Sequence, residues 1–292
     1  MVFKRFIKYV LPKKVKLKIL NYLDQDYIVV DYWSSKINNF GDELTPFILS
    51  KITFKEIINI QNKKFFHKKV IISFIGSILS PNSRLNKKKI VLGSGIIDFV
   101  EEFNYGFKKV YFVRGPLTRE ILLNNMIDCP ELYCDPGLLL PFFYKPEAKI
   151  KKYKLGVIPH YVDKPSIKFM RLLKNFNEDV LSIDIQENIK DVINDICSCE
   201  IIASSSLHGL IVADAYNIPT CWIEFSENVI GNGFKFNDYY LSLGHNLVTP
   251  TNVENLETLD YLINSATTKN IENIDYGKIF ETISEALKEN DL

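Results

Sequence analysis

The sequence carries almost no net charge. Its 36 Lys and Arg residues are balanced by 35 Asp and Glu residues, which leaves a formal charge of +1 over 292 residues. Proteins that bind nucleic acid usually show a positive excess, because binding neutralises backbone phosphates. The composition therefore predicts no nucleic-acid partner.

Cysteine and histidine are also scarce. The five cysteines are odd in number and form no C-x-x-C pair, and several lie in apolar stretches, which indicates reduced thiols in a cytoplasmic protein. A structural zinc site needs about four well-spaced Cys or His ligands, whereas the four histidines are spread widely along the chain. No acidic pair stands out as a divalent-cation site. We therefore expect no metal.

No apolar run is long enough to span a bilayer. The N-terminus, "MVFKRFIKYVLPKKVKLKILNYL", carries seven Lys or Arg residues and no acid. One interpretation is a solvated basic helix that caps the domain. The other is a surface helix attracted to anionic lipid headgroups, which predicts a peripheral membrane contact through residues 1–20 at the inner face of the cytoplasmic membrane.

The chain is 47% hydrophobic, and apolar runs of strand length alternate with segments of helical period. This alternation is typical of an α/β fold, with parallel sheets covered on both faces. Segment 141–154, with two prolines and five lysines, is a candidate linker. We predict two doubly wound domains, 1–145 and 146–292, that face a cleft. The predicted strands are 26–33, 69–76, 89–95, 109–115, 154–160, 179–185, 200–206 and 220–225, and the predicted helices are 43–52, 116–126, 164–175, 187–197, 207–216 and 276–290.

Candidate site residues lie where the predicted strands end, which is the edge at which parallel sheets bind ligands. Asn39, Gly41 and Asp42 follow the first strand and precede a helix. Asp42 either caps that helix or takes part in chemistry, and the amides at the helix start could hold an oxyanion. Arg114 ends a buried strand, so we expect it either to pair with an internal carboxylate or to bind an anion.

A second group of candidates consists of small residues at strand ends. Gly93, Ser94 and Gly95 form the turn "GSG". Each such turn alone is weak support for a site, because glycine at a strand end is usual turn chemistry. Together with Gly41 and Gly209, they predict several backbone segments that approach one ligand.

The stretch "IIASSSLHGL" joins a predicted strand to a predicted helix. Ser204, Ser205 and Ser206 supply hydroxyls and amides at the helix start, whose positive end favours an anion. His208 in the first turn is the first candidate for a donor or general acid. His160, at the end of another strand, is either a packed histidine or a second catalytic candidate.

The elements "NNFGDELTP", "GSIL", "VLGSG", "VRGPLT", "DPGLLLP", "IPHYVDK", "SSSLHGLIVADAYNIP" and "GNGFKFNDYYLSLG" occur in this order between residues 30 and 245. In this order they resemble the polysaccharide pyruvyl transferase family. The resemblance implies two Rossmann-like domains of the GT-B kind. It also implies transfer of pyruvate from phosphoenolpyruvate (PEP), with no cofactor, onto a sugar acceptor that is free, nucleotide-linked or lipid-linked, giving a cyclic ketal in a bacterial surface polysaccharide.

This chemistry needs an anion site, an acid and a base. His208 is the expected acid and Arg114 the expected anion clamp, while Asp42, His160 and Glu224 are candidate bases or acceptor-binding groups. The resemblance implies an arginine before the Leu-His pair in many relatives, where this chain has Ser206. If that arginine binds PEP, this chain must use another cation, such as Arg114 or Lys235, or a different donor.

Lys235, placed in a glycine-rich loop after Glu224, is the second candidate for that cation beside Arg114. A solvated loop lysine is the alternative. Two other functions remain open at this point. They are a nucleotide-sugar-dependent glycosyltransferase of the same architecture and a non-catalytic protein that kept the fold.

Overall fold

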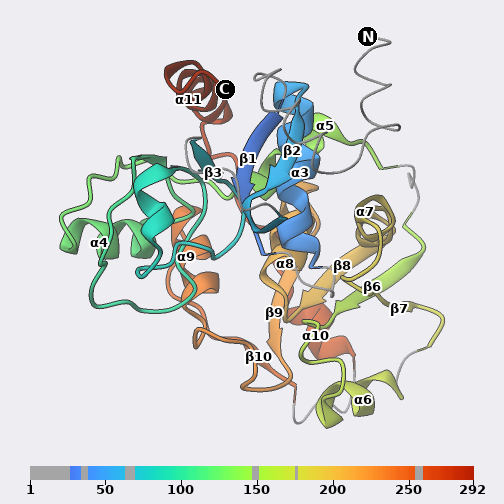
Figure 1. Cartoon of the computed structure of the whole chain (residues 1–292). Coiled ribbons are helices and arrows are strands. Elements are labelled where there is room, and N and C mark those ends of the chain that lie inside the picture. Colours follow the sequence, from blue (N-terminus) through green and yellow to red (C-terminus); the bar gives the residue numbers. More distant parts are fainter. Residues whose placement is uncertain (1–26, 34–38, 63–69, 147–150, 175–176, 254–258) are drawn as a thin grey trace.

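The chain folds around two parallel β-sheets. The computed structural model describes residues 27–33, 39–62, 70–146, 151–174, 177–253 and 259–292. In this part of the chain there are two five-stranded sheets, and every strand pair within them is parallel (Figure 1). The predicted α/β class is therefore confirmed, while the GT-B arrangement stays a prediction.

The first sheet has the strand order β2-β1-β3-β4-β5. Its strands are short and apolar, and alternate side chains face opposite sides. Ile28 and Val30 of β1 join the main core, whereas Val29 packs with Ile71 on the other face. The strands are β1 (Tyr27–Asp31), β2 (Glu56–Asn59), β3 (Ile71–Ser73), β4 (Lys89–Leu92) and β5 (Lys109–Phe112). The helical segments of this half are α3 (Phe40–Thr53), η1 (Ile60–Asn62), η2 (Arg84–Lys88), α4 (Pro116–Asn124), η3 (Pro136–Leu139) and α5 (Leu140–Phe143).

The second sheet has the order β10-β9-β8-β6-β7. Leu155 and Val157 of β6 face one core cluster, and Ile158 faces the other, so this sheet is also buried on both faces. Its strands are β6 (Tyr153–Ile158), β7 (Val180–Ser182), β8 (Cys199–Ser204), β9 (Thr220–Glu224) and β10 (Thr251–Asn252). Its helices are α6 (Ile167–Leu173), α7 (Ile189–Cys197), α8 (Leu207–Ala215), α9 (Phe234–Ser242), α10 (Asp260–Ser265) and α11 (Tyr276–Glu289).

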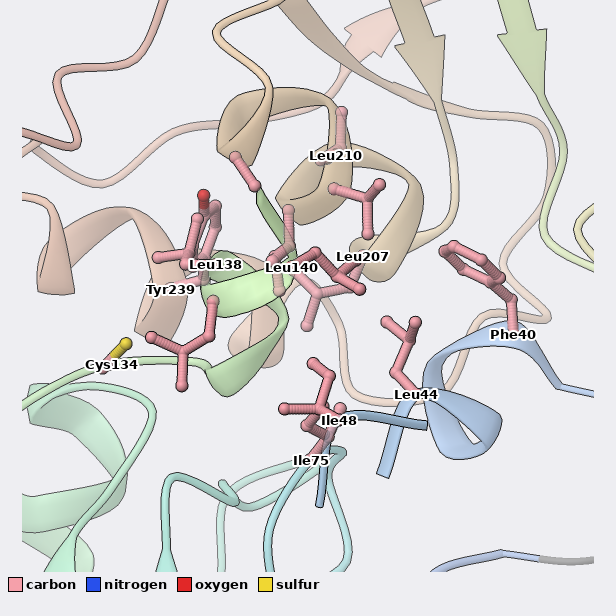
Figure 2. Close-up of a cluster of buried hydrophobic side chains, with 14 of the residues drawn as sticks. Phe40, Leu44, Ile48, Ile75, Cys134, Leu138, Leu140, Leu207, Leu210 and Tyr239 are labelled. Carbon is pink, nitrogen blue, oxygen red and sulfur yellow. The ribbon is translucent and has the colours of Figure 1, made fainter. Parts of the chain in front are cut away.

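Helix α8 lies at the centre of the molecule. Eight of its nine residues are buried, which is expected of a helix that is apolar on all sides. One hydrophobic cluster extends from the first sheet through α3 and segment 134–140 to α8 and the second sheet. Figure 2 shows part of it, with Leu44 and Ile48 of α3 opposite Leu207 and Leu210 of α8. The two sheets therefore share a core instead of meeting only through a linker.

Two C-terminal helices also contact the first half. In α11, Glu289 accepts hydrogen bonds from Tyr111 (2.6 Å) and Lys109 (2.7 Å), and Phe280 packs on Phe142 and Phe143. Helix α9 packs along α4. The division of the chain at residue 145 stays a prediction, but α9 and α11, which follow this residue, both contact segments that precede it.

Most predicted elements are found, with ends shifted by a few residues. The prediction missed β2, α5, α9, β10 and α10. The largest error is α9, because the sequence predicts a glycine-rich loop at Lys235, whereas Lys235 lies in this helix. Only Gly231, Asn232 and Gly233 have left-handed backbone angles, and the helix starts directly after them.

Candidate active site

A cavity of about 510 Å³ opens at the carboxyl ends of the strands of both sheets. This is the position at which open parallel sheets bind ligands, and the volume lies in the usual range for small-molecule sites. Residues from both halves line it. They include Trp33, Asn39, Asp42, Ser77, Ile97, His160, Tyr161, Ser206, His208, Ile230 and Lys235.

Six of the predicted site residues line this cavity, and they come from four separate segments of the chain. These are Asn39, Asp42, His160, Ser206, His208 and Lys235. The other nine lie outside its lining. They are Gly41, Gly93, Ser94, Gly95, Arg114, Ser204, Ser205, Gly209 and Glu224.

His208 is the one residue of α8 that is not buried, with 13% of its side chain exposed. Burial, together with the charges of Arg114 and Lys235, lowers its pKa to about 3, so the free imidazole is neutral at pH 7. Its ring lies against Gly41, where any side chain would overlap it. Gly41 therefore approaches the catalytic candidate and not the ligand directly.

Asp42 lies in the first turn of α3, two residues after the helix begins. The predicted capping role is not found, because the N-cap is Asn39 and its side chain makes no capping hydrogen bond. Burial raises the pKa of Asp42 to about 7, although a backbone hydrogen bond from Trp33 and the charge of Lys235 oppose the shift. A carboxyl group that titrates near neutral pH can accept or donate a proton.

His160 follows β6 and lies in the cavity wall. Its Nδ1 accepts a hydrogen bond from the Val162 amide at 3.4 Å, and its own amide donates to Ser205 Oγ at 2.8 Å. Burial, together with the charge of Lys235, lowers its pKa to about 3. The described contacts therefore hold a neutral imidazole in place.

Lys235 lies in the first turn of α9 and not in a loop, with 9% of its surface exposed. Its ammonium makes no hydrogen bond or ion pair with any other residue in the described ranges. Burial lowers its pKa to about 8, and nearby Arg114 adds to the shift. It is the only Lys or Arg among the described residues that line the cavity.

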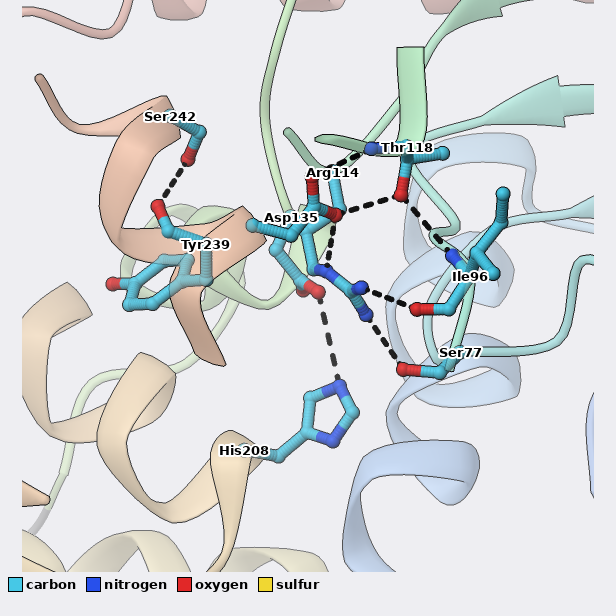
Figure 3. A network of polar contacts seen from close by, with 9 residues as sticks. Ser77, Ile96, Arg114, Thr118, Asp135, His208, Tyr239 and Ser242 are labelled. Atoms are coloured by element: carbon cyan, nitrogen blue, oxygen red, sulfur yellow. Dashed lines mark hydrogen bonds and ion pairs between the residues drawn. The ribbon is translucent and has the colours of Figure 1, made fainter. Parts of the chain in front are cut away.

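Arg114 is fully buried and pairs with an internal carboxylate, the alternative to the predicted anion clamp (Figure 3). Its Nε donates to Asp238 Oδ2 at 3.0 Å, and its two terminal nitrogens donate to Ser77 Oγ (2.6 Å) and the Ile96 carbonyl (2.7 Å). Asp238 also accepts from the Thr118 amide and hydroxyl. Arg114 therefore lies behind the cavity wall and supports it through Ser77.

Two of the three predicted serines bind other parts of the protein. Ser204 Oγ donates to the Ser206 carbonyl at 3.0 Å, and Ser205 Oγ donates to Asp163 at 2.7 Å. Asp163 also accepts from Ser226, so it joins the loops that follow β6, β8 and β9. Only the third serine, at the α8 N-cap, reaches the cavity, and its side chain makes no capping bond.

The remaining predicted residues have structural contacts. Side chains at Gly93, Gly95 and Gly209 would overlap Pro136, Arg114 and Ser204, so these glycines admit protein groups and not a ligand. Ser94 is fully buried. Glu224 is partly buried at the end of β9, outside the cavity lining.

Residues 17–227 match the polysaccharide pyruvyl transferase family. The chain belongs to this family. The match covers most of the chain and confirms the resemblance carried by the motifs, and it implies a transferase. Lys235 and Asp238, on α9, lie beyond the residues matched to the family.

Two curated relatives are similar over most of this chain. The uncharacterised protein L143 of Acanthamoeba polyphaga mimivirus is 31% identical over 221 residues, which are 74% of this chain and 75% of L143. The succinoglycan biosynthesis protein ExoV of Rhizobium meliloti (strain 1021) is 28% identical over 228 residues, which are 73% of this chain and 64% of ExoV. A crystal structure of the functionally uncharacterised protein KP1_0663 from Klebsiella pneumoniae aligns with a TM-score of 0.43 and 14% identity, over 79% of this chain and 97% of that one.

The sequence does not identify Ser77, Asp135, Asp163 and Asp238 as parts of the site and its support. Ser77 and Asp135 belong to the motifs "GSIL" and "DPGLLLP", but nothing in these motifs identifies the partners of the two residues. In the described part of the chain no group of three His, Cys, Asp or Glu side chains could hold a metal ion. Within the same part, no helix has the length and apolar character needed to cross a membrane.

Proposed function

We propose that this chain transfers pyruvate from PEP onto a sugar of a polysaccharide precursor and closes a cyclic ketal. One observation carries the proposal. The N-termini of α3 and α8, neither capped by its N-cap side chain, reach one cavity together with the ammonium of Lys235. Uncapped helix N-termini and a buried cation favour an anionic ligand.

PEP carries a phosphate and a carboxylate, so its binding needs several donors. The amides at the start of α8 can bind one of these two anionic groups, and the Lys235 ammonium can bind the phosphate or the carboxylate. Because Ser206 stands where many relatives have arginine, and Arg114 is engaged by Asp238, Lys235 is the cation that supplies the missing charge.

The reaction has a simple proton balance. Two sugar hydroxyls each lose a proton and form a C–O bond to the central carbon of PEP. One proton is needed at the methylene carbon, which becomes a methyl group, and the other is balanced by the departing phosphate as its C–O bond breaks. Asp42 and His208 line the cavity and are the proposed proton carriers, with His160 as the next candidate.

The acceptor is proposed to bind at the apolar side of the cavity. Trp33 and Ile230 line the cavity and keep 59% and 66% of their surface exposed, and Tyr161 adds a second aromatic ring. Sugar rings present apolar C–H faces beside their hydroxyls, so an aromatic surface next to Asp42 suits such a molecule.

The direct test supplies PEP and labelled nucleotide sugars in parallel to the purified chain. We expect release of phosphate from PEP only when a sugar acceptor is present, tested with free, nucleotide-linked and lipid-linked galactose-type sugars. Consumption of a nucleotide sugar without PEP would instead support a glycosyltransferase. PEP binding without turnover on any acceptor would support a non-catalytic role.

Lys235→Met tests the donor site. The change keeps the length of the side chain and removes its charge, so the Kd for PEP at pH 7 is expected to rise by roughly 10- to 100-fold, the range for a hydrogen bond to a charged group. Because the pKa of Lys235 is about 8, wild-type affinity should fall as the pH rises above 8 and the ammonium is lost. Calorimetric titration from pH 6.5 to 9.5 measures both effects.

The matched control is Lys278→Met, which removes an exposed lysine on α11 far from the cavity. It should leave the Kd and its pH dependence unchanged. If the Lys235 variant shows the same loss of affinity above pH 8 as the wild type, another group titrates there and the assignment is wrong.

The predicted membrane contact of residues 1–20 lies outside the described residues and stays a prediction. If the basic segment binds the bilayer surface, co-sedimentation with vesicles that contain anionic lipid should fall as salt rises and should be lost on deletion of residues 1–20. Binding that survives the deletion would contradict it.

A further inference from the structure

The two sides of the His208 ring meet different surroundings. Nε2 is fully buried and has no hydrogen-bond partner among the described residues. The nearest carboxylate oxygen is Asp135 Oδ2, 3.8 Å away, which is also fully buried and without a partner there (Figure 3). Two buried polar atoms that lack partners and face each other across this distance need an explanation, because such atoms are costly to leave unpaired.

The Asp135 carboxylate is held in place by its own segment. Its other oxygen, Oδ1, accepts the Gly137 amide at 2.9 Å as the N-cap of η3. Burial raises the pKa of Asp135 to about 6, while this hydrogen bond and the charge of Arg114 oppose the rise. At neutral pH the carboxylate is therefore mostly ionised, and it can only accept a hydrogen bond from His208.

The opposite side of the ring lies against Gly41 and the cavity. A Cβ at residue 41 would overlap Nδ1 of His208, so only a glycine leaves room for this nitrogen. His208 lines the cavity with 13% of its side chain exposed, and Nδ1, unlike Nε2, is not among the fully buried unpaired polar atoms of the described residues. Nδ1 is therefore the ring nitrogen that keeps access to the cavity.

We propose that Asp135 is a positioning residue that holds His208 as the Nε2–H tautomer, and that Nδ1, for which Gly41 leaves room at the cavity, is the nitrogen that exchanges protons with the substrates. The tautomer follows from the geometry of the chain alone. The assignment of Nδ1 to proton exchange rests on the proposed function.

This arrangement gives His208 two consecutive tasks. In the neutral ring, the Nδ1 lone pair takes the proton of a sugar hydroxyl as its oxygen bonds to the central carbon of PEP, while the C=C electron pair takes a proton from Asp42 at the methylene carbon. The imidazolium formed donates Nε2–H more strongly to Asp135, which offsets the burial that disfavours its charge. Nδ1–H then gives its proton to the phosphate as its C–O bond breaks, the second sugar hydroxyl bonds to the same carbon and returns a proton to Asp42, and the ring is neutral again.

The His208 tautomer that results from its pairing with Asp135 should therefore be detectable without any substrate. Long-range ¹H–¹⁵N spectra distinguish the two neutral tautomers of histidine, and His208→Gln identifies the signals. We expect the Nε2–H form for wild-type His208 at pH 7.5. The charged and titratable groups that face the ring are Asp135, Arg114, Lys235 and His160.

Asp135→Asn is the decisive variant. The Asn oxygen can still accept the Gly137 amide, but its NH₂ group then faces Nε2, which must become an acceptor, so His208 should change to the Nδ1–H form. We expect kcat to fall roughly 10- to 100-fold, as on removal of comparable histidine-orienting groups, with the KM for PEP little changed and the pH profile of kcat shifted. Gly41→Ala should displace the ring and lower kcat as well.

Asp214→Asn is the matched control. Asp214 is a buried carboxylate on the helix that carries His208, and it accepts hydrogen bonds from Thr220 and Tyr239 outside the cavity lining. It should preserve both the tautomer and kcat. An Nδ1–H ring in the wild type would overturn the proposal even if Asp135→Asn fails to fold, as would an unchanged tautomer in a folded variant. A chain with the expected tautomers that does not use PEP would refute the proposed function and leave the pairing intact.

Discussion

His208→Gln is expected to lower kcat by about 10³, within the range usual for loss of a general acid–base group. Gln can retain a hydrogen bond to a substrate, but it cannot accept and return a proton. The KM for PEP should change far less, because Lys235 and the helix amides still hold the donor in the ground state. Phosphate release at saturating PEP and acceptor measures both parameters.

His245→Gln is the control, because His245 is a partly exposed histidine outside the cavity lining. It should leave kcat within about two-fold of the wild type, as expected of a surface substitution. Near-normal turnover of the His208 variant would reduce His208 to a binding residue. Proton transfer would then belong to Asp42, whose pKa of about 7 suits it, or to His160.

The strands and the site's position at their ends were predictable because both depend on local patterns. Apolar runs such as "KVIISFIG" can be buried only inside a sheet, and the carboxyl ends of parallel strands share one edge. The same reasoning found His208 and Asp42, since each is a polar residue at the start of a helix that follows a strand. These predictions needed no information about which distant segments meet.

The missed elements show what local patterns leave out. Helix α9 buries Phe236, Tyr239 and Tyr240, a spacing of three and four residues that is typical of a helix, but the preceding "GNG" indicated a loop. Glycine in a sequence is similarly ambiguous. It can make room either for a ligand or for another part of the protein, and at Gly95 it makes room for the Arg114 guanidinium.

Long-range charge pairs lie beyond such reasoning altogether. Arg114 and Asp238 are 124 residues apart in the chain, and Asp135 and His208 are 73 apart. An arginine at a strand end has the same sequence signal whether it binds a substrate or an internal carboxylate. Only the packing of α9 against α4 decides between the two, and that packing depends on the whole fold.

Arg114→Met should therefore act first on stability. Arg114 and Asp238 are both fully buried, and loss of one partner leaves a buried charge whose only described donors are the amide and hydroxyl of Thr118. Breaking a buried pair in this way typically lowers the free energy of unfolding by about 3–5 kcal/mol. Urea unfolding followed by circular dichroism measures the change.

The ion pair between Lys109 and Glu289 provides the control. Like the Arg114–Asp238 pair, it joins a C-terminal helix (here α11) to the first half of the chain, but its side chains are about half exposed. Lys109→Met should lower the free energy of unfolding far less than Arg114→Met does, since solvent screens such pairs. A comparable loss in both variants would mean that the burial of Arg114 has no special effect.

A second change separates lost charge balance from lost packing. Adding Asp238→Asn to Arg114→Met removes the unpaired charge, and the Asn oxygen can still accept the Thr118 amide, so the double variant should recover part of the lost stability. PEP affinity should fall in the single variant and recover in part in the double variant, because Lys235 lies three residues before Asp238 on the same face of α9. If Arg114 instead bound PEP directly, the double variant would regain stability while its affinity stayed as low as that of the single variant.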